Sequence, residues 1–182
     1  MNTHVRLAVS AAVLAVVFPH LAYPADDAEM ITSAESAAPK AVAANASVLA
    51  VQADGTVKTL REGTNGWWCL PDDATTPGPD PMCGDANAMG WAMAWMGKTE
   101  PPKGKTGFIY MLMGGASASN LDPYQAAPAD GTDWSMDGPH VMIVNFGDAM
   151  SGYPEMEPMP DVTRPYVMWA GTPYQHLMLP VQ

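Results

Sequence analysis

Basic side chains are scarce in this sequence, which has 8 lysines and arginines against 19 aspartates and glutamates among 182 residues. The net charge of -11 argues against binding to nucleic-acid backbones or anionic lipid surfaces, because both require basic patches. With 16 glycines and 18 prolines, the chain has too few of both for low-complexity disorder. We therefore expect a globular protein, and its length indicates a single domain.

Long apolar runs are also lacking after residue 18, so we expect no later stretch to cross a membrane. The apolar run at residues 7–18 follows Arg6 and ends at Pro19, which is the pattern of a secretory signal peptide. Cleavage is expected after Ala22 or Ala25, and the product is expected in the periplasm or outside the cell. We divide the chain into a signal peptide (1–25), an Ala/Ser-rich leader (26–46) and one α+β domain (47–182).

Cysteine is rare, with Cys69 and Cys83 as the two examples in the chain. In an exported protein this pair predicts a disulfide, which contributes about 3 kcal/mol for a loop of this size. A two-cysteine metal site is the alternative, although it lacks the further cysteines or histidines of zinc sites. Four prolines between the cysteines indicate a stiff loop rather than a helix or strand.

Hydrophobic periodicity predicts an α+β fold, in which an antiparallel or mixed β-sheet is covered by one main α-helix and joined by long polar loops. The helix is expected at residues 85–97. Strands are expected at residues 47–52, 57–61, 67–70, 106–113, 140–146, 166–169 and 175–179. The long loops are 114–138 and 147–164. Within the leader, a short helix at residues 30–38 and a mobile segment are the two alternatives.

The helix at residues 85–97 is apolar on all sides. At 100° per residue, Met89, Met93 and Met96 form one stripe, and Trp91 and Trp95 lie on nearly the opposite side. Such a helix is buried between two layers or offers one side to another molecule. We expect burial, and the Trp91/Trp95 side is the candidate surface for a protein partner.

Methionine is abundant, at 15 residues, and two methionines stand in His-x-Met pairs: His140 with Met142, and His176 with Met178. Residues two apart on a strand face the same side, so each strand would present an imidazole and a thioether together. These soft ligands suit Cu(I). The pair Met111 and Met113 on a third strand is a further source of sulfur. The alternative is that the methionines only fill gaps in the core.

The segment Tyr174-Gln175-His176-Leu177-Met178-Leu179 resembles the His-x-Met segment of periplasmic copper chaperones with a cupredoxin-like fold. The resemblance implies copper binding through His176 and Met178. Those proteins also carry a further His-Met element and a separate upstream methionine. Here His140 is followed by Val141, which departs from that pattern, and Met150 is the candidate for the separate methionine.

A broader resemblance covers most of the chain after the leader. It rests on Thr64-Asn65-Gly66-Trp67, Pro81-Met82-Cys83, Gly138-Pro139-His140-Val141-Met142, Pro173-Tyr174 and His176-Leu177-Met178. These segments are similar to landmarks of a group of small exported bacterial proteins of unknown function. The resemblance implies an exported domain and no particular activity.

A small secreted hydrolase is the competing class of function. Ser117 and Ser119 follow a predicted strand and would act as nucleophile, with His140 or His176 as base and Asp133 or Asp137 to orient it. The segment is not a Gly-x-Ser-x-Gly elbow. We therefore interpret the chain as a binding domain rather than an enzyme, with soft metal as the leading ligand and a structural or protein-interaction role as the further alternative.

Overall fold

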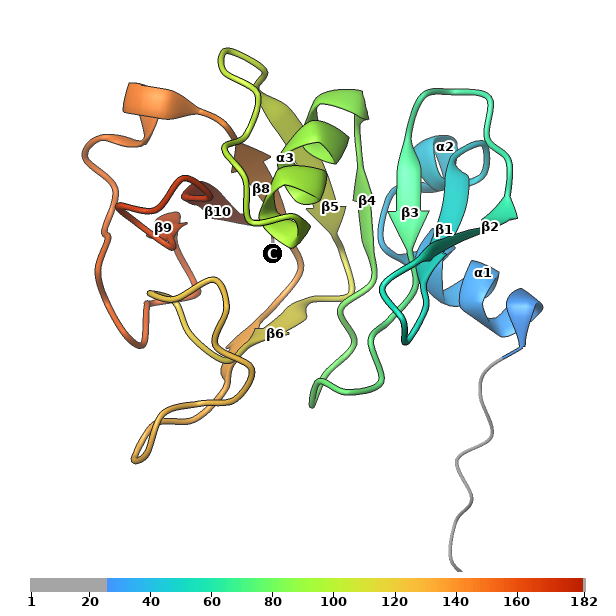
Figure 1. The fold of residues 1–182 in the computed structure, drawn as a ribbon. Helices are drawn as coiled ribbons and strands as arrows, with labels where there is room; N and C mark the ends of the chain where they lie inside the picture. The colour runs from blue at the N-terminus through green and yellow to red at the C-terminus, as the bar shows by residue number, and fades with distance from the viewer. Residues whose placement is uncertain (1–25, 182) are drawn as a thin grey trace, which may run out of the picture.

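A computed structural model describes residues 26–181, and the predicted signal peptide lies outside this range. The main element is a mixed eight-stranded sheet in the order β2-β1-β3-β4-β5-β8-β10-β9 (Figure 1). Its strands are β1 (Ser47–Val51), β2 (Val57–Arg61), β3 (Trp68–Leu70), β4 (Met82–Gly84), β5 (Gly107–Met111), β8 (His140–Val144), β9 (Tyr166–Met168) and β10 (His176–Pro180). The strands β6 (Gly115–Ser117) and β7 (Ser135–Asp137) form a separate antiparallel pair.

The helices are short: α1 (Asp27–Ser36), α2 (Lys40–Ala43), α3 (Ala86–Met96) and one turn of 3-10 helix, η1 (Gly147–Met150). The prediction of an α+β fold with one main helix over the sheet is therefore wrong. The molecule is mostly sheet, and α3 packs mainly on the part of it formed by β4 and β5 (Figure 1). An eight-stranded sheet is too wide for one helix of eleven residues to cover.

Acidic side chains begin both longer helices. Asp26 forms a capping box with Glu29, whose backbone N–H donates to the Asp26 carboxylate at 2.8 Å. Asp85 accepts from the backbone N–H of Ala88 at 2.8 Å, and the helix ends at Gly97 as expected. Of the two alternatives for residues 26–46, the structure thus has the helix, which begins three residues earlier than predicted.

Alternation along the strands separates two apolar layers. One face of the sheet carries Trp68, Ile109 and Met142, which pack with Trp91 and neighbouring residues of α3. The other face carries Cys69, Cys83 and Val48, which pack with alanines of α1 and α2. Beyond these cysteines, a third cluster on this second face joins Leu177 and Val167 to Met150 of η1.

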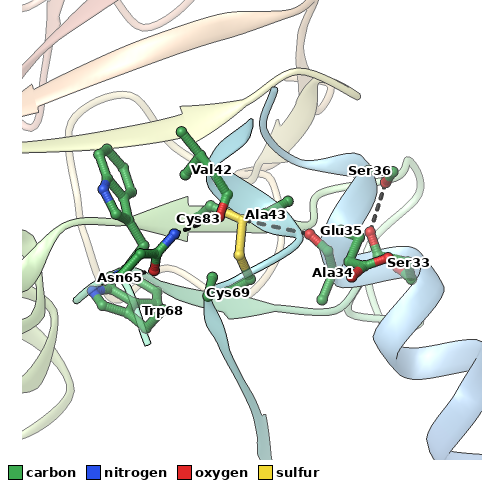
Figure 2. The surroundings of a disulfide bond; sticks show 12 residues. Ser33, Ala34, Glu35, Ser36, Val42, Ala43, Asn65, Trp68, Cys69 and Cys83 are labelled. Carbon is green, nitrogen blue, oxygen red and sulfur yellow. Dashed lines mark hydrogen bonds between the residues drawn. A yellow bond between two sulfur atoms is a disulfide. The ribbon is translucent and has the colours of Figure 1, made fainter. Parts of the chain in front are cut away.

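The predicted disulfide joins Cys69 of β3 to Cys83 of β4, which are direct partners across the two strands. Both cysteines are fully buried under α1, and Cys83 Sγ lies 3.5 Å from the carbonyl oxygen of Ala34 (Figure 2). Since both sulfurs are in the disulfide, the two-cysteine metal site is ruled out. The segment between the cysteines is not wholly a loop, because β4 occupies its end.

Candidate metal-binding site

The four predicted ligands lie on one face of two adjacent antiparallel strands, β8 and β10. Met142 and Met178 are direct partners in the register. His140 is opposite Pro180 and His176 is opposite Val144, so the imidazoles stand at opposite ends of the paired segment. The structure therefore brings the two methionines together and places one histidine beyond each end of this pair.

Both histidines are buried, with exposed fractions of 3% for His140 and 1% for His176. The Nδ1 atom of His140 lies 2.7 Å from the carbonyl oxygen of Gly138, and that of His176 lies 3.0 Å from the carbonyl oxygen of Tyr174. A carbonyl oxygen can only accept a hydrogen bond, so Nδ1 donates in each ring. In the neutral imidazole this leaves the lone pair on Nε2.

Neither Nε2 atom has a hydrogen-bond partner among residues 26–181. A buried polar atom without a partner costs about 1–3 kcal/mol. Such atoms are rare in folded proteins and often mark the place of an ion or a functional group. A carbonyl oxygen that fixes the ring through Nδ1–H and leaves the Nε2 lone pair for a metal is the usual setting of a metal-binding histidine.

Burial sets the protonation of both rings. Loss of hydration lowers the pKa of His176 from 6.5 to about 4, against a smaller opposing effect of its bond to Tyr174. Burial also lowers the pKa of His140, although the bond to Gly138 and the nearby Asp137 carboxylate act in the other direction. Both imidazoles are therefore neutral at pH 7, which is the form that binds metals.

Two further methionines stand beside the histidines. Met111 of β5 is the direct partner of His140, and Met168 of β9 is the direct partner of His176. Met111 was predicted as a source of sulfur and Met168 was not, because one sequence does not show which strand pairs with which. Met113, the Met-x-Met partner of Met111, is 49% exposed. Met150 packs with Leu177 on the other face of the sheet.

The surroundings of His140 are polar on one side. A Cβ atom on Gly115 would lie 3.1 Å from Met111 Cε and 3.6 Å from His140 Cε1, so these two side chains converge at this glycine. The hydroxyl of Tyr166 donates to Asp137 Oδ1 at 2.6 Å. Burial raises the pKa of the Asp137 carboxyl, and its negative charge raises the pKa of His140.

The surroundings of His176 are aromatic. Its ring centroid lies 5.3 Å from that of Trp91 and 4.9 Å from that of Trp169, nearly perpendicular to both. Trp169 directly follows Met168 and has a φ of +57°, a conformation rare for a bulky residue. Consecutive strand residues point to opposite faces. This left-handed turn instead allows Met168 and Trp169 both to approach the same histidine.

Residues of the alternative Ser/His/Asp arrangement form hydrogen bonds with other partners. The Ser117 hydroxyl donates to the carbonyl oxygen of Ser119, and the Ser119 hydroxyl accepts from backbone N–H groups of the same loop. Asp137 binds Tyr166 rather than a histidine ring. The described residues thus contain no hydrogen bond from a serine to either imidazole.

The candidate partner surface on α3 faces inward. Trp91 is buried, and the indole N–H of Trp95 donates to the carbonyl oxygen of Pro123 at 3.1 Å. Trp95 also packs on Trp169, with ring centroids 5.3 Å apart. The exposed side of the helix is instead the methionine stripe, where Met93 is 52% and Met96 45% exposed.

In the described range of the chain, no group of three His, Cys, Asp or Glu side chains is arranged to hold a metal ion. No helix of residues 26–181 has the length and apolar character that a membrane span needs. Comparison with protein-family models, with curated proteins and with solved structures finds no match to this chain.

Proposed function

We propose that this chain is an exported binding protein for a soft monovalent metal, Cu(I), with His140, Met142, His176 and Met178 as ligands. The observation that carries the proposal is the pair of buried neutral imidazoles, each fixed through Nδ1 and each with an Nε2 atom that lacks a partner among residues 26–181. Met142 and Met178 lie between them on the same face and add thioether sulfurs, which are soft donors.

The chemistry of these donors favours Cu(I) over other common metals. Carboxylate and carbonyl oxygens suit magnesium and calcium, whereas thioethers with imidazoles suit Cu(I). A thioether carries no proton and forms no disulfide. It therefore remains a ligand in an oxidising compartment, where cysteines pair as Cys69 and Cys83 do. That disulfide also supports the proposal that the protein works in the periplasm or outside the cell.

Titration of the mature protein with Cu(I) under anaerobic, reducing conditions tests this function, with a coloured Cu(I) chelator as competitor. The test variant is Met142→Leu/Met178→Leu, which keeps the buried volume while it removes both sulfurs. The matched control is Met93→Leu/Met96→Leu, which removes two exposed sulfurs.

We expect the control to bind Cu(I) as the wild type does and the test variant to bind at least about tenfold more weakly. A His140→Ala/His176→Ala variant should lose uptake altogether. Circular dichroism and thermal unfolding confirm that each variant is folded. Equal Cu(I) affinity in the wild type and both histidine- and methionine-substituted proteins would contradict the proposed function.

A further inference from the structure

We infer that the donors form two separate sites, each made of one imidazole and two thioethers, so that one chain takes two Cu(I) ions. The His140 set is His140, Met142 and Met111, and the His176 set is His176, Met178 and Met168. This inference rests on the proposed function and adds two ligands and a stoichiometry to it.

The register separates the two histidines. His140 pairs with Pro180, which is four residues from His176 along β10. At about 3.4 Å per residue this offset is roughly 14 Å along the strands. Metal–imidazole bonds are about 2 Å long, so one ion cannot reach both rings while the strands stay paired.

Each histidine instead has its own two methionines among its neighbours on the same face. One methionine follows it by two residues on its own strand: Met142 for His140 and Met178 for His176. The other is its direct partner on the strand that flanks the β8–β10 pair: Met111 on β5 for His140, and Met168 on β9 for His176. Directly opposite residues have Cβ atoms about 5 Å apart, within reach of a flexible thioether and an imidazole.

The His140 set has a counter-charge for a buried cation. Asp137 is half-buried, and its charge acts on His140. The salt bridges of the described residues do not include it. Burial of an unpaired charge is costly. A monovalent cation held by His140 and its two methionines would offset part of that cost.

The His176 set has aromatic rings in place of a carboxylate. Trp91 and Trp169 are nearly parallel, with centroids 6.2 Å apart, and the imidazole of His176 stands across both. Indole faces attract cations within about 6 Å of the ring centroid. The left-handed backbone at Trp169, which is rare for a bulky residue, places this indole beside the histidine.

The different neighbours give each site its own signal. Cu(I) at the His176 set should quench the fluorescence of Trp91 and Trp169, whereas Cu(I) at the His140 set should leave it nearly unchanged. Saturation is measured as Cu(I) bound per chain on the mature protein. The variants are His140→Ala and His176→Ala, with Met111→Leu and Met168→Leu as volume-conserving partners and exposed Met113→Leu as control.

We expect two Cu(I) per chain in the wild type and in the Met113→Leu control. Each histidine variant should keep one, bound within about twofold of its original affinity, because sites without a shared partner are nearly independent. Quenching should be lost with His176→Ala or Met168→Leu and kept with His140→Ala or Met111→Leu. One Cu(I) per chain, lost with either histidine, would overturn the two-site inference and leave the proposed function intact. No bound Cu(I) would overturn both.

Discussion

The two halves of the sheet pack different kinds of side chain. The disulfide half, made of α1, α2 and β1 to β4, packs alanine, valine and the Cys69–Cys83 bond. The histidine half, made of α3, β5 and β8 to β10, packs tryptophan, methionine and both described histidines. The cluster under α1 thus has a covalent link and small side chains, whereas the cluster under α3, to which β3 adds Trp68, has large polarisable ones.

The halves also differ in how their buried polar groups are satisfied. In the disulfide half, the Arg61 guanidinium pairs with Glu35 and donates to the carbonyl oxygens of Ala43 and Ala46. The buried polar atoms without a partner in residues 26–181 all lie beyond that half: Trp91 Nε1, Asn120 Oδ1, His140 Nε2 and His176 Nε2. Proteins depart from full satisfaction mainly at functional sites, so the contrast supports the proposal of a site in the histidine half.

The largest effect is expected from acidic pH, which should act on the histidine half. In the metal-free protein, folding lowers the pKa of His176 from 6.5 to about 4, which is worth roughly 3 kcal/mol. The unfolded chain binds the proton more readily, so stability is full above pH 6.5 and is lost as the pH falls toward 4. Burial of His140 acts in the same direction. Urea unfolding of the wild type and of His176→Leu across this range isolates the imidazole from the carboxylates. An NMR titration midpoint for His176 near 6.5 would refute the expectation.

Removal of the disulfide, which lies in the disulfide half, should lower the free energy of unfolding by a similar amount. The Cys69→Ala/Cys83→Ala variant loses a cross-link between residues 14 apart, and its free energy of unfolding should fall by about 3 kcal/mol. Cu(I) uptake should persist wherever the variant is still folded, because none of the proposed ligands lies in that half. A change in the free energy of unfolding below about 1 kcal/mol would contradict the predicted role of the disulfide. Loss of Cu(I) uptake by the folded variant would contradict the independence of the two halves.

Tyr166→Phe should have a smaller effect. It removes the hydroxyl that donates to the half-buried Asp137 carboxylate, which should cost about 2 kcal/mol and raise the pKa of Asp137 further. Tyr110→Phe is the matched control, because Tyr110 packs on the α1 side of the sheet and its hydroxyl makes no side-chain hydrogen bond in the described residues. Thermal unfolding of the two variants side by side measures the difference. Equal stability would show that Asp137 does not need this partner.

The smallest effect is expected at the surface of the disulfide half. Lys58 pairs with Asp27 at 2.8 Å, and both side chains are about half exposed. Lys58→Ala should therefore change the free energy of unfolding by about 0.5 kcal/mol or less, and high salt should remove the difference. A larger loss would mean that α1 is held to β2 mainly by this ion pair.

Local patterns in the sequence located most elements but not their arrangement. The Asp85 cap and Gly97 marked α3, and alternating residues marked β8 and β10. The strands β4, β6 and β7 have three residues each, among prolines and glycines, and exist because neighbouring strands pair with them. The width of the sheet, and hence the error in the fold class, depends on such non-local pairing.

The candidate site was predictable to the same degree. The period of two on a strand places His140 with Met142 and His176 with Met178, and the structure keeps both pairs on one face. The fixed Nδ1 atoms, the Asp137–Tyr166 bond and the place of Met168 arise from contacts between segments far apart in the chain. Periodicity carries no information about these contacts.

The burial of the disulfide has a consequence for the order of events during maturation. Cys69 and Cys83 are fully buried, with α1 packed over them (Figure 2). An oxidising enzyme or small disulfide must reach the thiols, so the bond must form before α1 docks. The helix then shields the bond from reductants. The N-terminal helix therefore covers a disulfide that formed before it docked, and it protects that bond from reduction.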